Sequence, residues 1–251
     1  MPKSFKMKKR NFLRSFRKFL PKKNFPYRIM SGKNQGMKIY TSLHNYPSAI
    51  FGRTEKDLLR WFSKNVSKDE TWIDVGANYG YTVLALSKNI GPEGKIYAFE
   101  PVTSTFEALN ETIKLNNLKN IETYCIALSD NKNLFKKRFQ STRGMLTNED
   151  SSSKLEISLI SLDSYFDYNT INKIDGIKID VDGPELEVLI GMKSLLEIHG
   201  PKIVIEVHDK SYDSVKKFLS RFNYKQSEII YKPFYATGES VENSNIVFLK
   251  S

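Results

Sequence analysis

A short apolar run that ends in a glycine turn constrains the fold more than any other part of this sequence. The run covers residues 72–75, and Gly76 and Gly80 bracket the turn that follows. Such a run suits a buried parallel strand, and the two glycines let the backbone turn tightly and approach a ligand closely. Residues 82–86 then place apolar side chains at helical spacing, and Gly91 stops that pattern. The sequence therefore predicts a strand, a ligand-binding turn and a helix in succession.

The turn departs from the glycine pattern of dinucleotide-binding folds. In that pattern, G-x-G-x-x-G, the second glycine lets the backbone approach a pyrophosphate. Counted from Gly76, the second and third glycine positions hold Asn78 and Tyr81. The acid expected about 20 residues further on is present, because Glu100 ends the predicted strand 96–99 and can accept both hydroxyls of a ribose. The sequence thus has a carboxylate that can bind a ribose but lacks the glycine turn that would bind a phosphate. This combination indicates S-adenosylmethionine, which carries adenosine and a sulfonium but no phosphate.

Three motifs resemble those of the FkbM-family methyltransferases. They are the segments 74–80, 178–185 and 206–208, and the likeness runs in order from about Gly32 to the end. The family more often has Glu where this chain has Asp182, a change that keeps the charge and shortens the reach. The resemblance implies a Rossmann-like class I methyltransferase fold: a mainly parallel seven-stranded sheet with an antiparallel C-terminal hairpin and helices on both faces. It also implies S-adenosylmethionine as cofactor and O-methylation of a sugar or polyketide hydroxyl.

The order of the predicted elements also indicates an α/β fold with a mainly parallel sheet. Strands predicted at 72–75, 96–99, 121–127, 176–180 and 203–207 alternate with helices, and strands near 226–231 and 245–249 close the chain. In such a sheet a ligand lies at the carboxyl ends of the strands. We divide the chain into a basic amphipathic arm (1–24), N-terminal strands with a pre-sheet helix (25–70) and a methyltransferase domain (71–251).

Several helix starts and one insertion carry local predictions. Thr54, Ser104 and Asp182 each stand where a side chain can cap a predicted helix, and the latter two are followed three residues later by Glu. The helix after Thr54 should cover the cofactor pocket, and a single helix should run over 184–199. The polar stretch 131–154 is either a hairpin with a loop over the acceptor site or a plain surface excursion.

Positive charge is concentrated at the N-terminus. The formal net charge is +11, and residues 1–23 hold ten Lys or Arg and no acid. The remainder is nearly neutral, with 29 basic and 28 acidic residues. Phe12, Phe16 and Phe19 recur at helical spacing among the basic residues, which is typical of an amphipathic helix on an anionic membrane surface. A solvated tail, a helix packed on its own domain and, with less support, nucleic-acid binding are the alternatives.

Cysteine usage and hydropathy bear on the compartment. The single cysteine, Cys125, excludes an internal disulfide framework and is compatible with a reducing compartment. No apolar run approaches the roughly 18 residues that span a bilayer, and the arm lacks the apolar centre of a secretory signal. We therefore expect a cytoplasmic protein that the arm can hold at a membrane surface.

The predicted cofactor contacts come from the turn, from the ends of neighbouring strands and from the start of the pre-sheet helix. They are Glu55, Asp74, Gly76, Ala77, Asn78, Gly80, Tyr81, Glu100, Pro101, Ala127 and Asp180. Glu55 also suits the dipole at a helix start, so its functional role is one of two interpretations.

Methyl transfer to a hydroxyl needs alignment and a proton acceptor. The acceptor and the methyl group must be held about 3 Å apart and in line, and an alcohol benefits from a base or a Lewis-acid metal. We predict His208 as the base, because imidazole has a suitable pKa, and Asp180 as the group that orients the acceptor, with Glu206 beside them. Asp180, Asp182 and Glu206 are also hard oxygen ligands suited to Mg²⁺, and metal dependence stays open.

These features favour an S-adenosylmethionine-dependent O-methyltransferase acting on a sugar, a glycan or a related polyhydroxyl metabolite. Residues 180–183 lack the Asn/Asp-Pro-Pro-aromatic tetrad of enzymes that methylate nucleobase amines. Cys125 lies within a predicted strand, where a buried structural thiol suits it better than the nucleophile of cytosine C5 chemistry. An RNA 2′-O-methyltransferase that uses the basic arm and a tethered, non-catalytic binding module are the alternatives.

Overall fold

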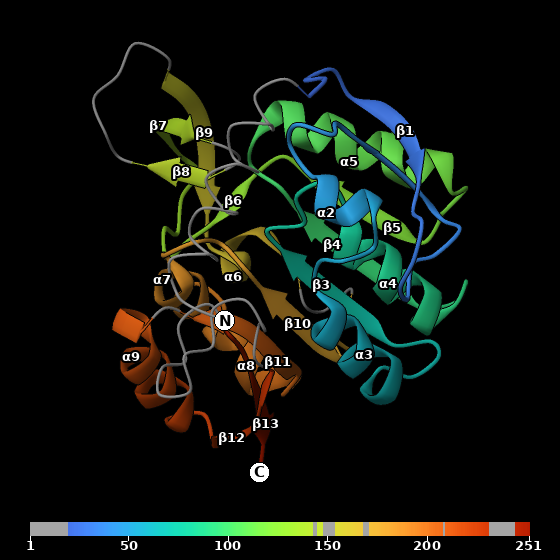
Figure 1. Ribbon diagram of the computed structural model, residues 1–251. Coiled ribbons are helices and arrows are strands. Elements are labelled where there is room, and N and C mark those ends of the chain that lie inside the picture. The colour runs from blue at the N-terminus through green and yellow to red at the C-terminus, as the bar shows by residue number, and fades with distance from the viewer. Residues whose placement is uncertain (1–19, 143–144, 148–153, 168–170, 208, 231–243) are drawn as a thin grey trace, which may run out of the picture.

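A seven-stranded sheet forms the centre of the protein (Figure 1). The computed structural model describes residues 20–142, 145–147, 154–167, 171–207, 209–230 and 244–251. In spatial order the strands are β12 (Tyr224–Ile230), β13 (Ser244–Lys250), β11 (Lys202–Val207), β10 (Gly176–Ile179), β3 (Thr71–Val75), β4 (Lys95–Phe99) and β5 (Ile121–Tyr124). Neighbours from β11 to β5 pair in parallel, and β13 is antiparallel to both β11 and β12. The predicted mainly parallel sheet with a C-terminal hairpin is confirmed.

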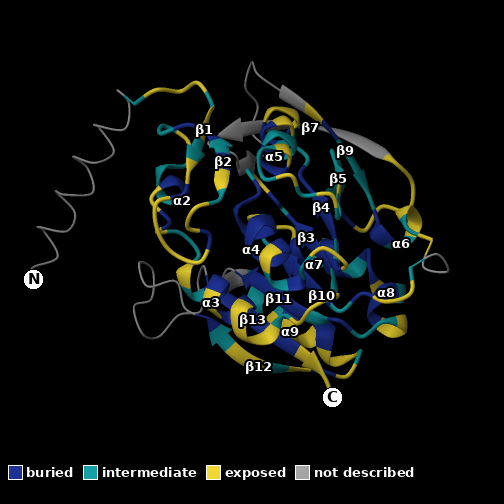
Figure 2. Cartoon of the chain, turned by 90° about the vertical axis from the view of Figure 1, so that its right-hand side faces the viewer, coloured by how far each residue is buried: buried dark blue, intermediate teal, exposed yellow. Residues whose placement is uncertain are grey.

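Helices cover both faces of this sheet, as predicted (Figures 1 and 2). One face carries α3 (Lys56–Asn65), α4 (Tyr81–Ile90) and α5 (Thr103–Leu115), and the other carries α6 (Leu162–Tyr165), α7 (Glu185–Ile190), α8 (Lys193–Ile198) and α9 (Asp209–Ser220). Successive side chains of a strand point to opposite faces, so Trp72 packs in one core cluster and Ile73 in the other. Within the described residues, no helix combines the length and apolar character that crossing a bilayer requires.

A small N-terminal lobe, which we define as residues 20–54, packs beside the sheet. It contains the antiparallel strands β1 (Phe25–Arg28) and β2 (Lys38–Thr41) and the helix α2 (Pro47–Ile50). Strand β2 lies along α5, where the Tyr40 N–H donates to Thr112 Oγ1 at 3.0 Å. The Asn34 side chain donates to the Tyr81 carbonyl at the start of α4, at 2.8 Å. These bonds fix the lobe to the helices that flank the first strand of the large sheet.

The polar insertion contributes to a second sheet. Its strands are β6 (Ala127–Leu128), β9 (Lys154–Ile160), β7 (Phe135–Thr142) and β8 (Met145–Thr147), in that spatial order. The strand predicted over 121–127 is therefore divided between the two sheets. Strand β5 ends at Tyr124 because its neighbour β4 ends at Phe99, directly opposite, and Pro101 cannot extend that ladder.

The predicted helix starts and the helix over 184–199 need correction. The residues preceding α3, α5 and α7 are Glu55, Val102 and Pro184, none of which makes a side-chain cap, so Thr54, Ser104 and Asp182 are not the cap residues. The helix over 184–199 is two helices, α7 and α8, because the backbone breaks at Gly191. A Cβ there would lie 1.8 Å from the Ser129 carbonyl oxygen. The Asp163 carboxylate then caps α8 by accepting the Ser194 N–H at 2.8 Å.

Candidate active site

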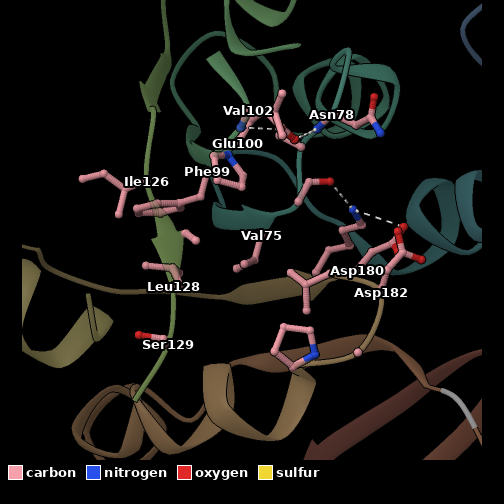
Figure 3. A pocket seen from close by; sticks show the side chains of 18 of the residues that line it. Val75, Asn78, Phe99, Glu100, Val102, Ile126, Leu128, Ser129, Asp180 and Asp182 are labelled. Atoms are coloured by element: carbon pink, nitrogen blue, oxygen red, sulfur yellow. Dashed lines mark hydrogen bonds and ion pairs between the residues drawn. The ribbon is translucent and has the colours of Figure 1, made fainter. Parts of the chain in front are cut away.

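A cavity of about 820 Å³ opens at the carboxyl ends of the parallel strands (Figure 3). It is lined by the segments that follow β3, β4 and β10, by residues 126–131, by Leu159 of β9, and by Tyr46 and Glu55 from the N-terminal side. Small-molecule sites have volumes of about 300–1,000 Å³. The cavity is therefore large enough for a cofactor and part of an acceptor, at the edge of the sheet where the sequence predicts them.

One wall of the cavity is apolar and another is acidic. In Figure 3, Phe99, Ile126 and Leu128 lie on one side, and Asp180 and Asp182 lie on the other. The remaining charged lining residues are Glu55, Glu100, Asp130, Lys178 and Glu187. The cavity therefore suits a ligand with an apolar ring at one end and positive charge at the other.

The two glycines of the turn allow neighbouring protein segments to pack closely, and they do not open space for a ligand. Gly76 has a φ of +79°, and a Cβ at this position would lie 1.9 Å from the Asp180 carbonyl oxygen. Gly80 has a φ of +86°, and a Cβ there would lie 2.8 Å from Leu109 Cδ1. Both positions need glycine, because a side chain would push the end of β3 away from β10 or α4 away from α5. The close contacts of these two glycines therefore fix the position of the turn that bounds the cavity.

Glu100 stands at the end of β4 with its carboxylate facing the cavity (Figure 3). It is only 6% exposed. The Asn78 N–H donates to Oε2 at 2.9 Å and the Val102 N–H donates to Oε1 at 3.0 Å. Burial raises the pKa of this carboxyl to about 7, although the two backbone hydrogen bonds and the charge of Lys178 oppose the rise. Each oxygen keeps further acceptor capacity for a ligand hydroxyl.

Lys178 is a charged residue of the cavity lining that the sequence analysis did not single out. Its side chain is 2% exposed, and Nζ lies 3.0 Å from Asp74 Oδ1 and 3.6 Å from Asp180 Oδ2. Nζ also donates to the Gly76 carbonyl at 3.0 Å. Burial by itself would lower the pKa of Lys178, but the charges of Asp74 and Asp180 outweigh it and raise the pKa above its ordinary value. A single charged residue within the apolar strand β10 was the available signal.

Most of the predicted cofactor contacts line the cavity. They are Glu55, Gly76, Ala77, Asn78, Tyr81, Glu100, Pro101, Ala127 and Asp180. Gly80 is not among the lining residues, and neither is Asp74, which is fully buried beneath the cavity and accepts the Thr82 hydroxyl at 2.5 Å. Asp74 therefore supports the site through Lys178 and Thr82.

Of the two predicted catalytic residues that the structure describes, only Asp180 is found at the cavity. Asp180 lines the cavity with Asp182, whereas Glu206 does not. Glu206 is 7% exposed in β11, which is separated from β3 by β10, and it pairs in register with Asn245 of β13. His208 lies outside the described residues. Among the described residues no three His, Cys, Asp or Glu side chains are grouped to hold a metal, so the suggested magnesium ligands do not converge.

The pre-sheet helix lies elsewhere than predicted. Helix α3 packs at the amino end of β3, where the Trp61 and Phe62 rings lie 6.5 and 5.6 Å from the Trp72 ring. The cavity is at the opposite end of that strand, so α3 does not cover it. Only Glu55, which precedes α3 with a left-handed φ of 50°, reaches the lining. Tyr46 of the N-terminal lobe lines the cavity as well, and its ring centroid lies 6.2 Å from that of Tyr81.

Comparison with known families agrees with this geometry. Residues 74–225 match the model of the Methyltransferase FkbM domain. The chain belongs to the FkbM family of methyltransferases. The family resemblance carried by the three sequence motifs is thereby confirmed.

Individual relatives are distant from this FkbM methyltransferase. The hexuronic acid methyltransferase AglP of Haloferax volcanii is 28% identical over 158 residues, which cover 62% of this chain and 63% of AglP. A solved FkbM methyltransferase from Methylobacillus flagellatus KT has a TM-score of 0.56 at 18% identity, covering 76% of this chain and 47% of that one. Aeropyrum pernix fibrillarin has a TM-score of 0.52 at 12% identity, covering 90% and 87%. The two solved structures show that the fold is shared.

Proposed function

We propose that this FkbM methyltransferase binds S-adenosylmethionine in the cavity and methylates a hydroxyl of a sugar, a glycan or a related polyhydroxyl metabolite. Glu100 is the observation that carries the proposal. Its buried carboxylate is held by two backbone N–H groups and faces the cavity, which suits the two hydroxyls of a ribose. A protein of the same fold, the Aeropyrum pernix fibrillarin, binds S-adenosyl-L-methionine.

The walls of the cavity fit the rest of this cofactor. The apolar wall suits the adenine ring, which loses little by leaving water. The cofactor carries a sulfonium and an ammonium against one carboxylate, so it is cationic overall. The acidic wall, with Asp180, Asp182 and the nearby Glu55, suits that positive charge.

The sugar acceptor is supported by the AglP relative, whose name identifies it as a methyltransferase of a hexuronic acid. Neither alternative from the sequence, RNA 2′-O-methylation or a non-catalytic module, gains support from that relative. At 28% identity over part of each chain, the likeness favours a sugar and leaves its identity to experiment.

The chain's own residues have three tasks in this reaction. The cofactor supplies an electrophilic methyl group on its sulfonium, so the protein must mainly align the acceptor and accept its proton. Asp180 is assigned to orienting the acceptor hydroxyl, and Lys178 forms an ion pair with that carboxylate. His208, which directly follows β11 in the sequence, is assigned to accepting the hydroxyl proton.

Labelled cofactor tests this function directly. The protein is incubated with methyl-labelled S-adenosylmethionine and a fractionated extract of the source cells, and the label is followed into polysaccharide, lipid, RNA and small molecules. We expect label in a sugar-containing fraction. Glu100→Gln should reduce that signal, whereas Glu107→Gln, a change at an exposed acid on α5, should not. Label in RNA alone would reject the sugar acceptor, and equal labelling by both variants would reject the ribose site.

A further inference from the structure

The N-terminal lobe continues the basic character of the arm into the folded protein. The first 54 residues hold 14 of the 39 Lys and Arg and none of the 28 Asp and Glu. The basic residues within the lobe are Lys22, Lys23, Arg28, Lys33, Lys38 and Arg53, and all of them are exposed. Within the described residues, no carboxylate forms an ion pair with any of these six. The lobe therefore presents a strongly positive surface on a protein whose remaining residues are nearly balanced in charge.

The same lobe exposes large apolar side chains. Phe25, Met30 and Phe51 are 47%, 61% and 41% exposed. Met30 and Phe51 come from neighbouring segments, because the Met30 N–H donates to the Ile50 carbonyl at 2.9 Å. Figure 2 shows β1, β2 and α2 at the outside of the molecule, away from the strands β11–β13. These side chains can therefore reach a partner without unfolding any described element.

Cations and apolar side chains are interleaved on this surface. Lys23 Nζ lies 5.5 Å from the Phe25 ring centroid, and Arg53 Cζ lies 5.9 Å from the Phe51 ring centroid. Such pairs suit a membrane interface, where the apolar part enters the acyl boundary and the charge meets the headgroup phosphates. A nucleic acid would also attract the cations, but Met30, the most exposed of the three apolar residues, has no aromatic face on which a base can stack.

We propose that the N-terminal lobe is a docking surface for an anionic lipid membrane. Its six cations bind the lipid headgroups, and Phe25, Met30 and Phe51 insert into the interface. The lobe ends next to Glu55 and contains Tyr46, both of which line the cavity. Docking therefore brings the rim of the cavity to the membrane surface and favours acceptors that are presented there.

Vesicle binding by the full chain tests the proposal. Cosedimentation is measured with phosphatidylcholine vesicles, with and without phosphatidylserine. We expect binding only to the anionic vesicles. Arg28→Ala/Lys33→Ala/Lys38→Ala should weaken it roughly 100-fold, since each basic residue near an anionic surface contributes roughly fivefold. Phe25→Ser/Met30→Ser/Phe51→Ser should abolish the part of the binding that survives high salt, because insertion is not screened.

A matched control removes three exposed cations from the body of the protein. Lys119→Ala/Lys193→Ala/Arg221→Ala should bind the anionic vesicles within about twofold of the wild type, since charges held away from the surface are screened. If both lobe variants bind as tightly as the wild type, the residues before the lobe bind alone and the proposal is wrong. Loss of polyuridylate binding in the lobe variants, with vesicle binding unchanged, would assign the surface to a nucleic acid and also overturn it.

Discussion

Replacing Lys178 with methionine should destabilise the fold by about 3–5 kcal/mol, because it leaves a buried carboxylate without its cation. Asp74 has no exposed surface, and the Lys178 ammonium lies 3.0 Å from it. The hydroxyl of Thr82 still donates to Asp74 in the variant, but a neutral hydroxyl does not balance the charge. Domains of ordinary stability have unfolding free energies of about 5–15 kcal/mol, so this single change should remove about a fifth or more of the total.

An exposed ion pair provides the matched control. Lys95 lies 2.7 Å from Glu122, closer than Lys178 is to Asp74, but its side chain and that of Glu122 are 42% and 51% exposed. Water already solvates both partners, so Lys95→Met should cost less than about 1 kcal/mol. Urea unfolding followed by tryptophan fluorescence and circular dichroism measures both variants. We expect the loss of stability to depend on the burial of the ion pair rather than on its N–O distance, so Lys178→Met should cost more than Lys95→Met.

A second substitution separates the lost charge balance from lost packing. Asp74→Asn in the Lys178→Met background removes the stranded charge and keeps an acceptor for Thr82. We expect the double variant to be more stable than Lys178→Met alone, with a coupling energy of about 1–3 kcal/mol. The reasoning fails if Lys178→Met is as mild as Lys95→Met, or if the two destabilisations simply add.

Four further predictions concern Glu100, Gly76 and His208. Glu100 should make cofactor binding depend on pH: its pKa is near 7, so affinity measured by calorimetry should fall about tenfold per unit below pH 7, and Glu100→Gln should flatten the profile. The same raised pKa means that the protonated carboxyl stabilises the free protein, and this contribution should be lost as pH rises from 4.5 through about 7. Gly76→Ala should cost more than about 2 kcal/mol, because the added Cβ would both adopt a left-handed φ and collide with the Asp180 carbonyl. Gly36→Ala should cost about 1–2 kcal/mol, because Gly36 also has a positive φ but no heavy atom within 4 Å of an added Cβ. Thermal unfolding compares the two variants. His208→Ala should lower kcat by roughly 10²–10⁴-fold with nearly unchanged cofactor affinity, and full turnover across the neutral range would make that imidazole structural.

The sheet was predictable because its signals are local. Four of the five parallel strands, β3, β4, β10 and β11, are short, mainly apolar runs followed by a helix, and this alternation indicates the fold class without any knowledge of pairing. The helix over 184–199 was mispredicted because its break is not local. Gly191 interrupts the helix where its backbone meets that of Ser129, a residue about sixty positions earlier in the sequence. Such contacts leave no trace in the periodicity of the segment itself.

The cofactor cavity was predictable for a similar reason, and the group beneath it was not. Residues that follow parallel strands meet at one edge of the sheet, so Gly76, Glu100 and Asp180 fall together once the strands are located. The Lys178–Asp74 pair depends instead on register. These residues are direct partners across β10 and β3, which lie about a hundred residues apart in the sequence. Neither the neighbour order nor the register of the two strands can be read from either strand alone.

The register of these two strands also connects the buried core to the proposed acceptor site. Lys178 contacts Asp74 within β3, the Gly76 carbonyl in the turn and Asp180 at the cavity wall. Asp74 in turn holds Thr82 in the first turn of α4. One buried cation therefore links the strand, turn and helix that bound the cofactor side of the cavity to the carboxylate assigned to the acceptor. Because these groups share one cation, a variant at Lys178 cannot loosen the core without also moving Asp180, so its loss of stability and its loss of turnover should appear together.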